Sequence, residues 1–249
     1  MSHLFRSVEI HQGNLSWGRF LDAGTGWASL RWCSGLKTDS LTAVTGSKRR
    51  LAALKQDAGP QLRPVDRLLL GNWVDPQFLE QEQFDTVLVD YLVGALDRFA
   101  PYYQTRIFNR LRPLVRGRLY CIGLEPYREP NPEEEDGRLL QSLVALRDAV
   151  LLLKGDRPHR EFPRWWVVEQ LRASGFKVLK EETFPILYGE RFVKAELDVC
   201  RSCLTELPRE LQQSVRDYEA TLRRRLLTRV REKPLRWGSD YLVVAEPVI

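Results

Sequence analysis

The chain has 249 residues, of which 43% are hydrophobic and 29% are charged, and its formal net charge is +5 at pH 7. This composition is typical of globular proteins and excludes a disordered chain, a collagen-like repeat and a disulfide-rich scaffold. The excess of Lys and Arg is smaller than a dedicated nucleic-acid-binding protein usually carries. Its four cysteines are too few to stabilise a secreted fold and indicate a reducing compartment.

The N-terminal region does not have the pattern of a signal peptide, because polar residues such as Arg6 and Glu9 interrupt it. The longest apolar run, at residues 143–153, contains Arg147 and Asp148 and is too short to cross a bilayer. We therefore expect a soluble, cytoplasmic protein without a membrane segment.

In the first half of the chain, short apolar runs alternate with helical patterns. Strands are expected at residues 19–23, 40–45, 67–70, 84–89 and 118–123, and helices between them at residues 28–36, 47–56 and 102–114. Repeated strand–helix alternation predicts βαβ units, and therefore a parallel sheet with helices on both faces.

The second half is less regular. Residues 125–137 are expected to form a loop, since they contain three prolines and the acidic run Glu133–Asp136. Helices at 138–153 and 161–174 and strands at 177–179 and 240–245 follow, with a long helix at 206–232 before the last strand. That long helix is expected to pack through one stripe of residues: Leu211, Val215, Tyr218, Leu222 and Leu226. We expect a single domain over 1–249 with an insertion at about 125–165.

The most informative segment is LDAGTGWA, residues 21–28. Gly24 and Gly26 follow a strand directly, so the backbone can turn tightly and a ligand can approach the main chain. A dinucleotide fingerprint would have a third glycine where the chain has Ser29. Asp22 would repel a diphosphate but would attract a cation. S-adenosylmethionine fits this turn better, because it carries a sulfonium and an ammonium and no phosphate.

Over nearly all of its length the chain resembles the class I S-adenosylmethionine-dependent methyltransferases. LDAGTGWA resembles the first motif of that family, with Ala28 in place of the usual third glycine, and FDTVLVD resembles the fourth strand. The segments WVVEQLRASGFKV and DYLVVAEP resemble the last two strands. The resemblance implies an α/β fold with a doubly wound, mostly parallel, seven-stranded Rossmann-like sheet and an antiparallel edge hairpin.

The resemblance also implies roles for particular residues around S-adenosylmethionine. Gly24, Thr25 and Gly26 would line its methionine portion, and Asp22 would bind its ammonium. Asn72 would accept a hydrogen bond from the adenine amino group, and Trp73 would stack on the adenine face. Asp90 and Tyr91, after the fourth strand, would face the transferred methyl group and are the catalytic candidates.

One position departs from the family pattern. The second strand ends at Thr45, where the family usually has an acid that binds both ribose hydroxyls. A carboxylate would form two charge-assisted hydrogen bonds with the ribose, whereas a hydroxyl forms only one ordinary hydrogen bond. Cofactor binding would therefore weaken by roughly 1–2 kcal/mol. Because of Thr45, two alternatives stay open. The protein could be a non-catalytic member of the family, or the register could be shifted so that Ser47 or Asp39 helps to bind the ribose.

Methyl transfer from a sulfonium is an in-line displacement, which needs alignment of the acceptor and a base only if the acceptor is protonated. His159 is a candidate base, although we favour the simpler interpretation that it is a solvated residue in a loop. Candidate acceptor-binding residues lie in the loops and helices after the later strands: Glu125, Tyr127, Trp165 and Tyr188. The acceptor itself, a small molecule with an N, O or S nucleophile, is not defined by the sequence.

Two further features suggest alternatives. The basic stretch from Arg223 to Arg236 is expected to be a solvated helix face, and RNA or protein methylation through it is the alternative that we favour less. Cys200 and Cys203 form a lone C-x-x-C pair without two further ligands at matching spacing, so we expect no metal site.

Overall fold

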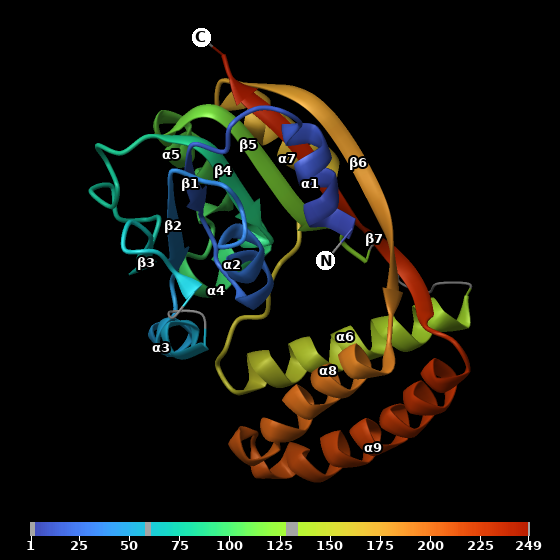
Figure 1. The fold of residues 1–249 in the computed structure, drawn as a ribbon. Coiled ribbons are helices and arrows are strands. Elements are labelled where there is room, and N and C mark those ends of the chain that lie inside the picture. Colours follow the sequence, from blue (N-terminus) through green and yellow to red (C-terminus); the bar gives the residue numbers. More distant parts are fainter. Residues whose placement is uncertain (1–2, 58–60, 128–133, 249) are drawn as a thin grey trace. The chain divides into compact units, whose positions relative to one another are not determined.

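The computed structural model describes residues 3–57, 61–127 and 134–248, and the chain divides into two compact units (Figure 1). The first, which we call the sheet unit, comprises Met1–Glu125, Arg160–Phe184 and Asp240–Ile249. The second, the helical unit, comprises Pro126–His159 and Pro185–Ser239. The expected insertion at about 125–165 contributes the first segment of the helical unit. Of the expected acidic run, Glu133 lies outside the described residues.

In the described part of the chain the sheet has seven strands, in the order β3-β2-β1-β4-β5-β7-β6. Strands β3, β2, β1, β4 and β5 pair in parallel, whereas β7 runs antiparallel to β5. This topology confirms the fold class expected from the sequence. In chain order the strands are β1 (Arg19–Asp22), β2 (Ser40–Thr45), β3 (Arg67–Leu70), β4 (Phe84–Asp90), β5 (Val115–Leu124), β6 (Phe176–Tyr188) and β7 (Leu235–Pro247).

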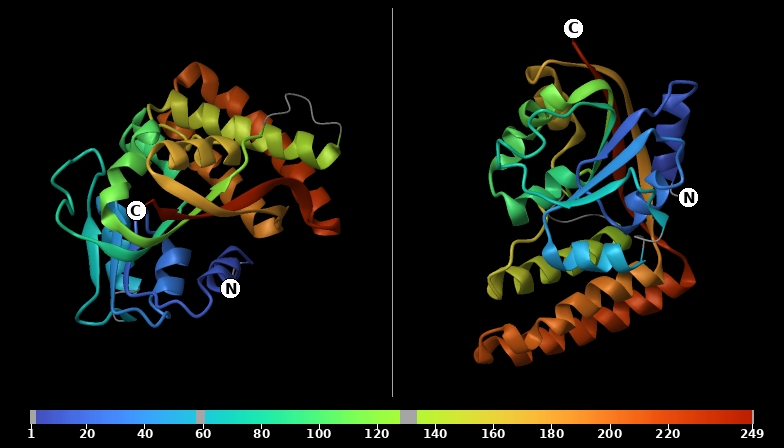
Figure 2. Two further views of the ribbon diagram at one scale, coloured as in Figure 1. Left: turned by 90° about the horizontal axis from the view of Figure 1, so that it is seen from above. Right: turned by 60° about the vertical axis from the view of Figure 1, so that its left-hand side comes forward.

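Helices cover both faces of the sheet within the sheet unit (Figure 2). On one face the core contains residues of α1 (His3–Gln12) and α2 (Trp27–Cys33) packed on Leu88 and Tyr120. On the other face it contains residues of α4 (Leu92–Phe99), α5 (Ile107–Leu111) and α7 (Arg164–Ala173). Burial on both faces explains the near-continuous apolar sequence of β4. α3 (Lys48–Asp57) buries only Leu54.

Some predicted helices in the sheet unit are wrong in extent. The helix expected at 102–114 is broken into α5 and two short 3-10 helices that flank it. The backbone of Tyr102 is in the left-handed region, with φ of 67°, and Pro113 lies in the second 3-10 helix. The sequence analysis also missed α1 and α4. Both are short, so their hydrophobic periodicity covers too few turns to distinguish them from a loop.

The helical unit consists of three main helices, α6 (Glu135–Leu153), α8 (Glu190–Ser202) and α9 (Arg209–Glu232). Their shared core includes Leu143, Leu197 and Leu226. The sequence analysis expected α6 and α9 but not α8. The expected packed stripe of α9 is only partly correct, because Leu211 and Tyr218 are exposed. None of the described helices has both the length and the apolar character needed to cross a membrane.

Several arginines of α9 form ion pairs inside the helical unit. Arg223 binds Glu219 and Asp198, each at 2.7 Å, and Glu219 is buried. Arg229 binds Asp136 at 2.8 Å. These arginines therefore stabilise the packing of α9 and contribute less to a free basic surface than their number suggests.

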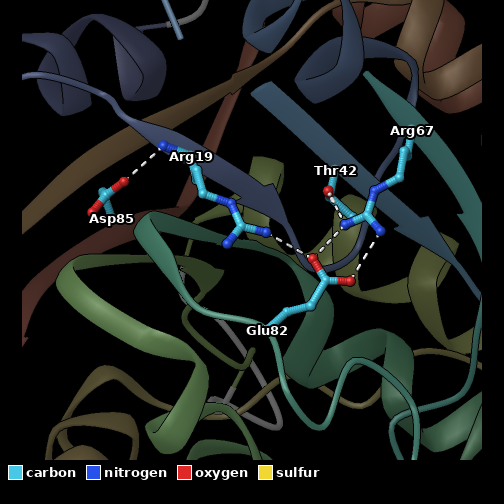
Figure 3. A network of polar contacts seen from close by, with 5 residues as sticks. All are labelled: Arg19, Thr42, Arg67, Glu82 and Asp85. Carbon is cyan, nitrogen blue, oxygen red and sulfur yellow. Dashed lines mark hydrogen bonds and ion pairs between the residues drawn. The ribbon is translucent and has the colours of Figure 1, made fainter. Parts of the chain in front are cut away.

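At the amino ends of the strands, acids and arginines of the sheet unit form a paired network (Figure 3). The Glu82 carboxylate accepts hydrogen bonds from Arg67 at 2.6 and 2.9 Å and from Arg19 at 2.9 Å. Arg67 also donates to the Thr42 hydroxyl, and the Arg19 backbone N–H donates to Asp85. The hydrogen bonds from Arg67, opposed by burial, hold the pKa of Glu82 below its usual value. This network links the starts of β1, β3 and β4.

Candidate functional site

The carboxyl ends of β1 and β4 form the switch point of the sheet. From β1 the chain continues outward to β2 and β3, and then returns to place β4 on the other side of β1. Loops that leave adjacent strands in opposite directions open a crevice there, and open α/β sheets bind their ligands in this crevice. The glycine turn at residues 23–26 follows β1 and therefore lies at this position.

Asp22, the last residue of β1, is fully buried. Burial raises the pKa of its carboxyl group to about 6, and the nearby Ser29 and Thr25 hydroxyls and Gly24 amide offset this only in part. Among the described residues, neither carboxylate oxygen has a hydrogen-bond partner of ordinary geometry. A buried carboxylate without a partner is costly, so the position favours a ligand that brings a positive charge or hydrogen-bond donors.

The glycine turn is fixed by backbone hydrogen bonds to both neighbouring strands. Ala23 donates to the Leu88 carbonyl at 2.9 Å, and Thr25 donates to the Val44 carbonyl at 2.7 Å. A Cβ at Gly24 would lie 3.0 Å from the Leu92 side chain of α4, so a larger residue here would force Leu92 to shift. A Cβ at Gly26 would meet nothing within 4 Å of the described residues. Gly26 therefore leaves open space beside the turn.

The next two strands bring three further predicted residues toward this edge. Thr45 ends β2 and is buried, and its hydroxyl accepts a hydrogen bond from the Ser47 backbone at 3.3 Å. Asn72 follows β3, and its amide donates to the Phe99 carbonyl while its oxygen accepts from Val74. Its oxygen has a second lone pair, so it retains capacity to accept from a ligand.

Trp73 occupies a different environment from the one that the sequence suggested. Only 3% of its surface is exposed, and its indole N–H donates to the Ala23 carbonyl at 2.8 Å. Its ring contacts Phe78 edge-on, with the centroids 5.4 Å apart. As placed, Trp73 supports the glycine turn from within the core. Adenine stacking on this ring stays a prediction, and it would require the side chain to move.

Asp90 and Tyr91 lie at the junction of β4 and α4. Burial, followed by the charges of Asp22 and Asp240, raises the pKa of Asp90 to about 8. Tyr91 has a left-handed backbone with φ of 48°, which is uncommon for a bulky residue and is typical of functional sites. Its hydroxyl donates to Asp240 at 2.7 Å. Burial, together with Asp240, raises the pKa of this hydroxyl, so it stays protonated.

The sequence analysis missed Asp240, which was assigned only as the start of a strand. Because β7 runs antiparallel to β5, its beginning lies at the edge where the parallel strands end, and Asp240 pairs with Leu124. Burial raises the pKa of Asp240, although the hydrogen bond from Tyr91 opposes this. The expected antiparallel direction of the last strand was the signal that could have placed Asp240 at the site.

A second feature that the sequence analysis missed is the segment Arg160–Phe162, which crosses α4. The Arg160 backbone N–H donates to the Gly94 carbonyl at 3.1 Å, and the Phe162 carbonyl accepts from the Tyr241 hydroxyl at 2.9 Å. A Cβ at Gly94 would lie 2.4 Å from the Glu161 carboxylate. Gly94 therefore allows Glu161 to lie directly against α4, near the end of β4.

The predicted acceptor residues are divided between the two units. In the sheet unit, Glu125 accepts a hydrogen bond from the Arg164 backbone at 3.2 Å, and Trp165 is 54% exposed on α7. In the helical unit, Tyr127 and Tyr188 share a hydrogen bond, and Tyr127 stacks on Trp237 with the centroids 4.3 Å apart. His159, also in the helical unit, is exposed. Within this set, the structure brings Tyr127 and Tyr188 into contact with each other.

Comparison with known proteins identifies the fold. No protein-family model matches the sequence, and no curated protein matches it. Among solved structures, a Bacillus halodurans C-125 protein with a provisional methyltransferase assignment has a TM-score of 0.63, 13% identity and complete coverage of both chains. A mycolic acid cyclopropane synthase complexed with SAH and CTAB has a TM-score of 0.56 and 16% identity, with 97% of this chain and 83% of that chain covered.

The cyclase SpnF is also similar, with a TM-score of 0.55, 16% identity, and 98% of this chain and 80% of that chain covered. At these identities the likeness establishes the fold, which is that of the class I methyltransferases. A cyclase among the similar structures illustrates that one fold can carry more than one reaction. The reaction of this chain must therefore be argued from its own residues.

Proposed function

We propose that the protein is an S-adenosylmethionine-dependent methyltransferase that acts on a small-molecule acceptor with an N, O or S nucleophile. The observation that carries this proposal is Asp22, a fully buried carboxylate beside the glycine turn whose oxygens have no hydrogen-bond partner of ordinary geometry among the described residues. The class I methyltransferase fold and the SAH complex of one similar structure support it.

The residues at the switch point fit this cofactor. The ammonium of S-adenosylmethionine would supply the charge and the donors that Asp22 lacks. Its methionine portion would occupy the open space beside Gly26, lined by Gly24 and Thr25. Asn72 retains an acceptor for the adenine amino group, and Thr45 would contribute one hydroxyl toward the ribose. When bound, the cofactor supplies a methyl group on a sulfonium, which breaks its C–S bond as the acceptor lone pair forms the new bond.

The rest of the chemistry is positioning, because the methyl group is already activated. Asp90 and Tyr91 stand next to Asp22 at the adjacent strand end and would face the acceptor. We propose Glu125 and Trp165, in the sheet unit, as further acceptor contacts. For the residues of the helical unit, an acceptor-binding role of Tyr127 and Tyr188 and a role of His159 as the base stay predictions. The ion pairs of Arg223 and Arg229 support a small acceptor over an RNA bound along α9.

Calorimetric titration of the protein with S-adenosylhomocysteine and, separately, with NAD tests the proposal. We expect S-adenosylhomocysteine to bind and NAD not to bind, and Asp22→Ala to abolish the binding. A matched control is Glu80→Gln, which removes one exposed negative charge from the same unit. Tighter binding of NAD, or unchanged binding in Asp22→Ala, would contradict the proposal. Cofactor binding without methyl transfer to any acceptor would favour the non-catalytic alternative.

A further inference from the structure

Three aspartates lie in one row on the same face of the sheet, at the carboxyl ends of the parallel strands. Side chains alternate along a strand, and residues directly opposite each other on neighbouring strands point to the same face. Asp22 pairs with Leu88, and Asp90 follows two residues later on the same strand. Asp90 pairs with Ile122, which pairs with Leu242, two residues from Asp240. Asp22, Asp90 and Asp240 therefore share a face.

Packing agrees with this assignment. Leu88, Ile122 and Leu242, which connect the three aspartates in register, belong to one hydrophobic cluster, and Tyr91 packs against it. The row is therefore built on a rigid, buried surface formed by β4, β5 and β7. Sites on strands are held more accurately than sites on loops, so these carboxylates are well placed to orient a ligand.

The charges around the row are acidic. The charged groups that act on Asp90 are Asp22 and Asp240, and those that act on Tyr91 are Asp240, Asp90 and Glu161. Burial, followed by the charges of Asp22 and Asp90, raises the pKa of the Cys33 thiol of α2. None of the described arginines or lysines is paired with Asp22, Asp90 or Asp240 in an ion pair. The row therefore needs positive charge from a ligand or protons from solvent.

The cofactor of the proposed function does not satisfy this need by itself. S-adenosylmethionine carries a sulfonium, an ammonium and a carboxylate, so its net charge is only about +1 against three aspartates. Its ammonium would be taken by Asp22, which leaves Asp90 and Asp240 without a counter-charge. Neither of these two acids, which lie on β4 and β7 with β5 between them, is at the glycine turn, so they define a second position along the row.

We propose that Asp90 and Asp240 form a subsite for a protonated amine, and that Tyr91 positions Asp240 within it. This inference rests on the proposed function, since it names the acceptor class of that same site. The amine ammonium would bind between the two carboxylates and compensate the charge that Asp22 and the cofactor leave. A neutral alcohol would not compensate this charge, because it brings none. A thiolate would add to the repulsion between the negative charges.

The subsite also provides for the proton that an ammonium must lose before it can act as a nucleophile. Asp240, whose carboxylate accepts the hydrogen bond from the Tyr91 hydroxyl at 2.7 Å, would hold the ammonium. The carboxylate of Asp90 accepts one N–H proton, which leaves the lone pair of the nitrogen free to form the new N–C bond. Asp90 suits this role because its surroundings favour its protonated form. The proton then passes from Asp90 to solvent, which restores the carboxylate.

Binding of small amines to the wild-type protein tests the inference directly, with two probes of different size. Dimethylammonium chloride and benzylammonium chloride are titrated into the protein saturated with S-adenosylhomocysteine, with 2-propanol and benzyl alcohol as the matched neutral compounds. We expect at least one amine to bind at least about tenfold more tightly than its neutral match. Equal binding of amine and alcohol in both pairs would overturn the inference.

Variants locate the subsite. Asp240→Asn is expected to weaken amine binding by about tenfold or more while S-adenosylhomocysteine binds as before, and Tyr91→Phe is expected to weaken it by a smaller factor. Glu80→Gln serves as the control for loss of one negative charge. Unchanged amine binding in Asp240→Asn would place the cation elsewhere and overturn the assignment.

Two measurements keep this test separate from that of the proposed function. If S-adenosylhomocysteine does not bind, the proposed function fails, and the amine titration of the protein alone still decides on the subsite. If Asp240→Asn does not fold, calorimetry of the wild type in buffers of different ionisation enthalpy replaces it. Amine binding near pH 7 is expected to release protons, because Asp90 loses its proton when a cation arrives. Binding without proton release would then overturn the role of Asp90.

Discussion

At the amino ends of the strands each acid of the network in Figure 3 contacts an arginine or a backbone amide, whereas at the carboxyl ends the acids face other acids. Glu82 lies between Arg19 and Arg67, and its pKa is lowered by those partners. Asp22 and Asp90 lack such partners among the described residues, and their pKa values are raised by burial. The two edges belong to the same sheet and both carry acidic residues, but Glu82 at the amino edge is paired with arginines.

The difference separates stability from function. A paired acid stabilises the protein without any ligand, while an unpaired buried acid costs stability until a cation binds. Because burial without pairing is unfavourable, its presence at the switch point indicates a site that a ligand completes. Mutations at the two edges should therefore have opposite effects.

The largest expected effect is on cofactor binding. Asp22→Asn should weaken S-adenosylhomocysteine binding by more than about 100-fold, because the ammonium loses its buried counter-charge. The same variant should raise the melting temperature of the ligand-free protein at pH 7.5, since the buried charge is removed. Calorimetry and thermal unfolding measure both effects. A variant that is less stable and still binds would reverse the assignment of the two edges.

The pH dependence of stability should differ between the edges. A carboxyl whose pKa is raised on folding binds its proton more tightly in the native state, so stability falls as pH rises. For Asp22 the pKa rises from 3.8 to about 6, which corresponds to about 3 kcal/mol lost between pH 4 and 7. Asp90 extends the loss to about pH 8. Urea unfolding across this range should show the decrease, and S-adenosylhomocysteine should reduce it.

The paired edge should show the opposite sign. The pKa of Glu82 is lowered from 4.5 in the native state, so the stability that its pairs provide is present above pH 4.5 and is lost as pH falls below that value. Glu82→Gln should lower the free energy of unfolding at pH 7 by about 1–2 kcal/mol, because the ion pairs are partly exposed. S-adenosylhomocysteine binding should not change, with Glu80→Gln as the control. Weaker S-adenosylhomocysteine binding in Glu82→Gln would contradict the separation of the two edges, because the amino edge would then also affect the ligand site.

The smallest expected effect is a gain. Thr45→Asp places an acid at the end of β2, where two charge-assisted hydrogen bonds to ribose hydroxyls would replace one from the Thr45 hydroxyl. S-adenosylhomocysteine binding should tighten by about tenfold, or about 1.4 kcal/mol, as measured by calorimetry. Adenosine alone should gain by a similar factor, since the contact is to the ribose. No gain for either ligand would place the ribose away from β2.

The central strands β1, β2 and β4 were predictable because parallel strands buried on both faces have a strong apolar signal. β2 and β3 were predicted with the observed boundaries, and β1 and β4 within one residue. α8 and the full length of β6 were missed. β6 carries alternating exposed and half-buried residues and ends in the helical unit, so its pattern is weak at the level of sequence.

The site was predictable where it depends on local sequence. The glycine turn and Asp22 are consecutive residues after a strand, so their chemistry can be interpreted together. Asp240 could not be assigned in this way, because its proximity to Tyr91 depends on the antiparallel pairing of β7 with β5, far away in the sequence. Likewise, the adenine-stacking role of Trp73 was predicted from the resemblance to the family. The direction of its side chain depends instead on its contact with Phe78 and on its hydrogen bond to the Ala23 carbonyl.

The strand order has a consequence for how the sheet assembles. β6 neighbours β7 and not β5, so it has no partner in the sheet until β7 has been synthesised and inserted between them. The pairing of β7 with β5 joins residues that lie 116 to 126 positions apart in the sequence, from Leu124 with Asp240 to Leu119 with Ala245, so it is the most non-local pairing of the sheet and the slowest to form. During synthesis, the open edge of β5 is therefore exposed the longest, and it is the region that we expect chaperones to protect.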